Sequence, residues 1–113
     1  MSIEQPDEID SVTIDAGNTI CRLAIIDHLQ WDERHLQALQ RKINHYLRCI
    51  ESGEIYRRHP QAAGCEFQIV ITAIFEPDET GRAFITQAME VLAESGFELA
   101  IVPFASAYAE TSC

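Results

Sequence analysis

Residues 67–75 form a long apolar stretch, and their pattern leaves few places for them in a fold. The stretch contains two phenylalanines, three isoleucines, a valine and an alanine, and its polar members are Gln68 and Thr72. Successive side chains of a strand point to opposite faces of a sheet, so a strand that is apolar on both faces needs cover on both. The pattern therefore predicts that residues 67–75 are an internal strand, with the rest of the fold arranged around it.

A β-hairpin is expected near the N-terminus. Residues 11–15 alternate between apolar and polar side chains, and residues 19–27 are rich in β-branched and aliphatic ones. The three residues between these segments are Ala16, Gly17 and Asn18, which suit a tight turn. The two segments are therefore predicted to pair.

A long amphipathic helix is expected from about residue 32 to residue 52. Asp32 is predicted as its N-cap, with Trp31 packing from the preceding position against Leu36. Gly53 suits a left-handed C-terminal cap. Apolar residues recur at intervals of three and four and should share the buried face: Leu36, Leu39, Ile43, Tyr46, Leu47 and Ile50.

The second half of the chain predicts a loop, a helix and a strand. Residues 54–65 are expected to form the loop, with a short extended piece at residues 54–57. A second helix should open at Pro77 and Asp78 and end at Gly96, followed by a strand at residues 97–102. The expected buried face of that helix comprises Phe84, Ala88, Val91, Leu92 and Ser95.

The predicted order β-β-α-β-α-β indicates an α+β two-layer sandwich, with both helices on one face of a four-stranded sheet. A length of 113 residues fits one domain, expected at residues 11–104. Residues 1–10 are predicted to be a flexible acidic lead-in and residues 105–113 a flexible tail. The second face of the sheet needs cover, which predicts a homodimer, with the tail as the alternative cover.

Charge is segregated along the chain. The formal net charge is −10, yet six of the eight basic residues fall within residues 34–58. Such a charge disfavours nonspecific binding to nucleic acid and to anionic membranes. The acidic first residues lack an apolar run, so no signal peptide is expected, and the four cysteines contain no C-x-x-C pair. These features predict a cytoplasmic protein with reduced thiols.

The segment that joins the hairpin to the long helix carries the first candidate site. Asp27, His28 and Trp31 supply a carboxylate, an imidazole and an indole, which suit a general acid–base site or a ligand pocket. Adjacent strand residues point in opposite directions, however, so Asp27 and His28 pair only if the turn rotates one of them. The alternative assigns Asp27 to turn hydrogen bonds, His28 to the surface and Trp31 to the helix start.

A basic stripe on the long helix is the second candidate. Arg34, Arg41 and Arg48 are seven residues apart and so lie on one side of the helix, and Arg58 follows shortly after with Arg57. Guanidinium groups bind phosphates and carboxylates well. The alternative is a solvated outer face balanced by the acidic residues of the protein.

Metal and enzyme signatures are weak. His45 and Cys49 lie four residues apart on the long helix, but no spacing fixes a third ligand beside them. The sequence contains no glycine-rich phosphate loop, no G-x-S-x-G elbow and no H-E-x-x-H. We therefore expect no metal, no cofactor and no catalytic residue.

Three segments together resemble a family of small bacterial proteins of unknown function. They are I-D-H-L-Q-W at residues 26–31, I-E-S-G-E-I-Y at residues 50–56 and L-A-E-S-G-F at residues 92–97. The likeness covers about residues 11–102. It implies a bacterial, cytoplasmic, single-domain protein and brings no activity, cofactor or catalytic residue with it.

The main functional hypothesis is a non-enzymatic acidic interaction protein, in the manner of small immunity proteins or inhibitors. An acidic surface accelerates association with a partner that has a basic surface. One alternative is a binding module for a small anionic ligand, or a minor enzyme, that uses Asp27, His28 and Trp31 together with an arginine. A further alternative is a homodimeric structural protein.

Overall fold

The computed structural model describes residue 3 and residues 9–17 and 19–103 of the chain. Its sheet has four strands in the order β1-β2-β3-β4: β1 (Ser11–Ile14), β2 (Ile20–Asp27), β3 (Glu66–Ala73) and β4 (Glu98–Pro103). The first two strands are antiparallel, whereas β2, β3 and β4 run parallel to one another. The hairpin and the internal position of β3 are confirmed.

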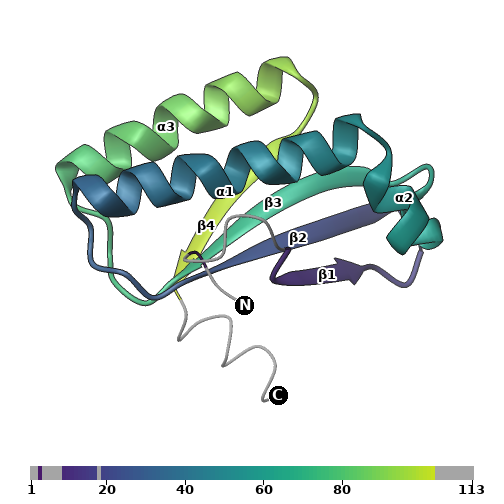
Figure 1. Ribbon diagram of the computed structural model, residues 1–113, viewed down its shortest axis with the longest axis horizontal. Helices are drawn as coiled ribbons and strands as arrows, with labels where there is room; N and C mark the ends of the chain where they lie inside the picture. The colour runs from purple at the N-terminus through teal and green to yellow at the C-terminus, as the bar shows by residue number, and fades with distance from the viewer. Residues whose placement is uncertain (1–2, 4–8, 18, 104–113) are drawn as a thin grey trace.

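Two helices cover the same face of this sheet and lie side by side (Figure 1). They are α1 (Glu33–Glu51) and α3 (Glu79–Glu94), and the predicted α+β fold with the order β-β-α-β-α-β is confirmed. The core lies between the helices and the sheet. Alternate residues of the strands fill it, and the fully buried ones include Cys21, Leu23, Ile25, Ile69 and Ile71.

The ends of α1 follow the predicted cap chemistry. The Asp32 carboxylate accepts a hydrogen bond from the backbone N–H of His35 at 2.8 Å. At the other end, Ser52 closes the helix and Gly53 adopts the left-handed conformation, with φ of 81°. Because Gly53 allows this sharp change of direction, the chain turns at once into the next element.

That next element is helical, so the predicted extended piece at residues 54–57 is wrong. Helix α2 (Glu54–Arg58) follows Gly53 directly, and a short 3₁₀ helix, η1 (Pro60–Ala62), completes the connection. The Arg58 guanidinium pairs with the Glu54 carboxylate at 3.1 Å, one turn away. This i,i+4 ion pair, together with burial of Ile55, explains why a helical turn forms there.

Strand β3 is shorter than its apolar sequence suggests, because it ends at Ala73, level with the end of β2 at Asp27. The backbone N–H of Ile74 still donates to the Asp27 carbonyl at 2.9 Å, but β2 ends at Asp27. Ile74 and Phe75 therefore leave the sheet, with 51% and 41% of their surfaces exposed. They had been predicted as part of the strand.

The buried face of α3 also differs from the expected one. Gly81, Ile85 and Leu92 face the core, whereas Val91 is 52% exposed and Ser95 is exposed. Some apolar residues of α3 pack against the core of the sheet, and others line the space between α3 and α1. Leu92 is the one predicted residue that is fully in the core.

Two residues of the predicted lead-in belong to the core. Ile3 is fully buried, and its N–H donates to the Ile26 carbonyl at 3.0 Å. The Asp10 side chain is fully buried in an ion pair with Lys42 at 2.8 Å. An apolar side chain and a paired carboxylate explain why residues 3 and 10 pack against the fold; the predicted tail at residues 105–113 lies outside the described residues.

Candidate functional site

Asp27 lies at the carboxyl end of β2 and points into the core. Its carboxylate approaches Nε2 of His35 at 2.5 Å and also accepts the backbone N–H of Leu29 at 3.2 Å. Asp27 and His35 are each 1% exposed. The structure thus pairs Asp27 with His35, a residue of the first turn of α1, whereas His28 is half-buried and makes contacts of its own.

The hydrogen-bond partners of His35 constrain its protons. Nδ1 lies 3.1 Å from the carbonyl oxygen of Gln30, and a carbonyl only accepts, so Nδ1 carries a hydrogen. Nε2 then faces the Asp27 carboxylate, with which it is hydrogen-bonded. Both side chains are buried, and their contact ties the end of β2 to the start of α1.

Trp31 extends this junction to α3. Its ring stacks on that of His35, with centroids 4.0 Å apart and planes tilted by 40°. Its indole N–H donates to the Phe75 carbonyl at 2.9 Å. Gly81 of α3 lies so close that a Cβ added there would sit 2.6 Å from Cε3 of Trp31. Trp31 therefore joins the beginnings of both long helices to the loop after β3.

A second polar network is buried beneath α1. Lys42 Nζ donates to Asp10, and the other oxygen of Asp10 accepts the N–H of Ile26 at 2.8 Å. The Tyr46 hydroxyl donates to the Ala24 carbonyl at 2.6 Å and accepts the N–H of Asp10 at 2.9 Å. Burial raises the pKa of Tyr46 well above its ordinary value. These groups hold Asp10 to β2 and α1.

Sequence reasoning missed His35, Lys42 and Gly81 as members of these networks. The signal for the first two was their position, since both lie on the α1 face that carries Leu39 and Ile43. A polar residue on a buried helical face needs a partner, and that requirement points to a buried acid. Gly81 carries no comparable signal, because its close neighbour Trp31 is distant in sequence.

The basic stripe lies away from these networks. Arg34, Arg41 and Arg48 are all exposed along the outer side of α1, and Arg58 is engaged by Glu54. Among the described residues, no hydrogen bond or ion pair joins these arginines to Asp27 or Trp31.

Cys49 sits between His45 and Glu54 near the end of α1. Its sulfur lies 3.5 Å from Nε2 of His45 and 3.6 Å from a carboxylate oxygen of Glu54. Burial, followed by the nearby Glu54 charge, raises the pKa of the Cys49 thiol, which disfavours the nucleophilic thiolate. Within the described residues, no group of three metal-ligating side chains converges on one point.

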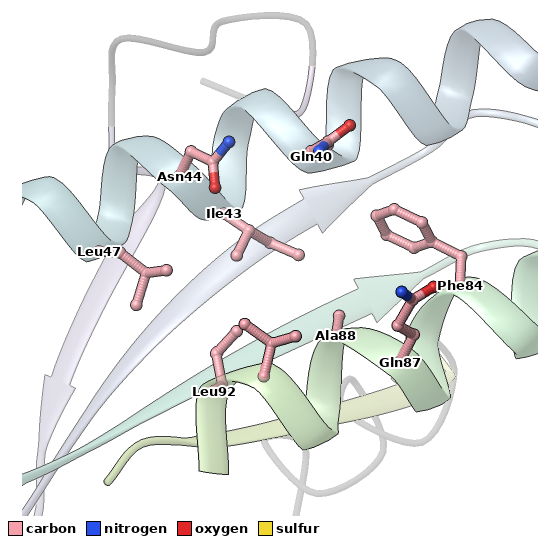
Figure 2. Close-up of a pocket in the computed structure, with 9 residues that line it drawn as sticks. Gln40, Ile43, Asn44, Leu47, Phe84, Gln87, Ala88 and Leu92 are labelled. Atoms are coloured by element: carbon pink, nitrogen blue, oxygen red, sulfur yellow. The ribbon is translucent and has the colours of Figure 1, made fainter. Parts of the chain in front are cut away.

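A groove runs between α1 and α3 on the side of the helices away from the sheet core, with a volume of about 220 Å³ (Figure 2). Figure 2 shows side chains from both helices pointing toward this space. Its apolar floor and amide rim contain no ionisable side chain among the described residues. The lining comprises Gln40, Ile43, Asn44 and Leu47 of α1 and Phe84, Gln87, Ala88, Val91 and Leu92 of α3.

Three of the α3 residues that line this groove had been predicted from helical spacing. Phe84, Ala88 and Val91 were predicted to share one face of α3. Phe84 and Ala88 are half-buried against the core, and all three also line the space toward α1. The shared helical face was right, but the neighbour that it contacts depends on how α3 is rotated. Helix spacing alone does not define that rotation.

None of the helices in the described part of the chain is both long and apolar enough to cross a membrane. A search of curated proteins and a search of solved structures each found no match. A scan of family models matched residues 1–104 to the Family of unknown function (DUF6572). The expected likeness to a family without known function is confirmed, and the chain belongs to this family.

Proposed function

We propose that this protein is a non-enzymatic binding module that takes an amphipathic helix of a partner protein into the groove between α1 and α3. The groove itself is the observation that carries the proposal. It combines an apolar floor with three amide side chains, Gln40, Asn44 and Gln87, in its lining. Protein interfaces have this composition, with an apolar centre and a polar rim.

The shape of the groove favours a helix as its occupant. Two neighbouring helices leave a channel between them, and a third helix fits such a channel with apolar residues at positions i, i+3, i+4 and i+7. Val91 is already exposed to the extent of 52% at this place, although it is a large apolar residue. Cover by a partner helix would remove that apolar surface from water.

Charged residues of α1 and α3 beside the groove specify which charges the partner helix should carry. Arg41 and Arg48 lie three and four residues from Asn44 and so flank it on the surface of α1. On α3, Glu90 lies three residues from Gln87 and Glu94 lies three residues from Val91. The matching helix carries acidic side chains on the side that faces α1 and basic ones on the side that faces α3.

The side chains that could carry out catalysis contact one another inside the protein, which supports a binding role over a catalytic one. Asp27 and His35 are buried against each other, Lys42 is paired with Asp10, and burial raises the pKa of the Cys49 thiol. The net charge of −10 adds long-range attraction for a partner whose overall charge is positive. We propose a location in the bacterial cytoplasm, where thiols such as those of Cys21 and Cys49 stay reduced.

Pairing of two copies through the open face of the sheet remains part of the proposal. Ala24, Val70 and Ala100 are register neighbours on the face opposite α1 and α3, and each is half-buried. This face is independent of the groove. Sedimentation at two ionic strengths tests the pairing, since a monomer under both conditions excludes it.

The groove is tested by affinity capture from the native host with two variants of α3. Val91→Asp puts a charge into the groove, whereas Ala93→Asp puts the same charge on an exposed position of another face of the helix. We expect a stoichiometric partner to be lost with Val91→Asp and retained with Ala93→Asp. A synthetic peptide of the partner segment should then bind the unmodified chain and become helical, as measured by circular dichroism.

Two results would overturn the proposal. One is a partner that binds both variants equally, which would place its contact elsewhere. The other is the absence of any stoichiometric partner under conditions in which the protein is folded.

A further inference from the structure

A second cavity, of about 240 Å³, lies at the carboxyl ends of β3 and β4. The loop after β3 forms one side of it through Ile74, Phe75 and Pro77, and the end of β4 forms another through Ile101 and Val102. The carboxyl ends of the parallel strands β2, β3 and β4 meet at this edge of the sheet. This cavity is separate from the groove between the helices.

The polar residues of the cavity carry opposite charges. Arg82 comes from the first turn of α3, and Glu76 comes from the loop that precedes that helix. Both side chains are exposed, and no ion pair joins them to each other. A guanidinium and a carboxylate that line the same small space without pairing are available for the two ends of a zwitterion.

The remaining lining is apolar and partly uncovered. Ile74 is 51% exposed and Phe75 is 41% exposed, although both are large apolar residues next to each other in the chain. A ligand that covered them would bury apolar surface now in contact with water. The volume of 240 Å³ corresponds to roughly eight water molecules at about 30 Å³ each. A ligand of about that many non-hydrogen atoms fits.

We propose that this cavity binds a small apolar α-amino acid. Its carboxylate pairs with Arg82, its ammonium group pairs with Glu76, and its side chain packs among Ile74, Phe75 and Ile101. The inference stands apart from the proposed function, because it uses none of the groove residues. The site also differs from the predicted one, since Asp27, His28 and Trp31 do not line this cavity.

Trp31 provides a direct readout. It is the only tryptophan of the chain, and its indole N–H donates to the carbonyl of Phe75, which lines the cavity. A ligand that contacts Phe75 alters the surroundings of the indole. Titration followed by tryptophan fluorescence and by isothermal calorimetry therefore measures binding without any assumption about activity.

Comparing leucine with analogues that lack one of its charged groups tests the contribution of each charge to binding. We expect L-leucine or, in its place, another apolar amino acid to bind with saturation. 4-Methylpentanoate, which lacks the ammonium group of leucine, and 3-methylbutylamine, which lacks its carboxylate, should each bind at least tenfold more weakly. Equal binding of the truncated compounds, or no saturable response to any apolar amino acid, would overturn the proposal.

Matched variants locate the site. Arg82→Gln and Glu76→Gln should each weaken amino-acid binding at least tenfold and leave the melting temperature unchanged. Arg57→Gln and Glu66→Gln remove the same charges at exposed positions outside the cavity and should bind as the unmodified chain does. Val91→Asp should also bind normally, which separates this test from that of the groove. Undiminished binding by Arg82→Gln would contradict the proposal.

Discussion

Gly81 of α3 leaves the space that the indole of Trp31 fills. A Cβ at position 81 would lie 2.6 Å from Cε3 and 3.1 Å from Cδ2 of that ring. Glycine is otherwise a poor residue inside a helix, by about 1 kcal/mol relative to alanine. Its presence here is explained by the close approach of Trp31.

Gly81→Ala should therefore destabilise the protein, although the same change in an ordinary helix stabilises it. We expect a loss of about 1–3 kcal/mol in the free energy of unfolding, measured by urea denaturation, because the added methyl group overpacks the junction. Combining it with Trp31→Leu should relieve the clash, so that Gly81→Ala in that background has a smaller effect or none. A rise in stability for the single variant would show that the indole does not occupy this place.

Asp27→Ala should remove about 3–5 kcal/mol of stability, since it leaves His35 buried without its partner. A double variant in which both residues become leucine should recover part of that loss, because two apolar groups replace a buried polar pair. Chemical denaturation followed by circular dichroism measures both. An unchanged denaturation midpoint for Asp27→Ala would contradict the buried pairing.

Arg34, Arg41 and Arg48 should be dispensable for folding. Each exposed arginine should contribute no more than about 0.5 kcal/mol. Replacing all three with glutamine changes the formal charge from −10 to −13, by loss of three positive charges. The melting temperature should hardly change, whereas binding of the partner helix should collapse if these side chains contact its acidic side. A large loss of stability would mean that the arginines hold the fold or a dimer contact.

Cys21 and Cys49 should resist alkylation in the folded protein. Burial raises the pKa of Cys21 from 9.0 to about 11, and so at pH 8 its thiolate fraction falls roughly a hundredfold below the ordinary one. Mass spectrometry after a short treatment with iodoacetamide should show modification at both positions only after denaturation. Rapid labelling of either thiol in the native protein would contradict its burial.

The same shift has a consequence for stability at alkaline pH. The unfolded chain releases the Cys21 proton near pH 9, whereas the folded chain retains it to about pH 11, so stability should fall as the pH rises through this range. Cys21→Ala should reduce that fall. A denaturation midpoint that is equally sensitive to pH in both proteins would exclude Cys21 as a contributor.

Ile71→Asp should prevent folding, since β3 is internal and Ile71 is fully buried. Ile74→Asp offers the control, because Ile74 is 51% exposed just beyond the same strand. We expect the first variant to be insoluble or unfolded by circular dichroism and the second to melt close to the unmodified chain. Similar behaviour of the two would show that the strand does not lie inside the sheet.

The sequence was sufficient for the features that depend on local pattern. The spacing of apolar residues predicted α1, and the capping residues Asp32 and Gly53 predicted its ends. The strand at residues 67–75, apolar on both faces, predicted the centre of the sheet. The turn before β2 was equally local, since Asp15 accepts hydrogen bonds from Thr19 and Ile20 across it.

Features that depend on distant partners were not predictable in the same way. Lys42 lies on the buried face of α1 and so requires an acidic partner, but helix spacing does not identify that partner as Asp10, 32 positions earlier. Val91 fits the apolar face of α3, but whether that face meets the sheet or the groove depends on how α3 packs against α1. Helix α2 was missed because its five residues carry too short a pattern to distinguish a turn of helix from an extended piece.

The parallel pairing of β2 with β3 has a consequence for how fast the chain folds. Arg22 donates to Gln68 across these strands, 46 residues apart in sequence, so the middle of the sheet cannot form until a long loop has closed. The local β1–β2 hairpin is marginal without a third strand. We therefore expect the rate-limiting ensemble to contain α1 docked on both β2 and β3. Mutations at Leu39 or Ile43 should then slow refolding, whereas those in β1 should mainly accelerate unfolding.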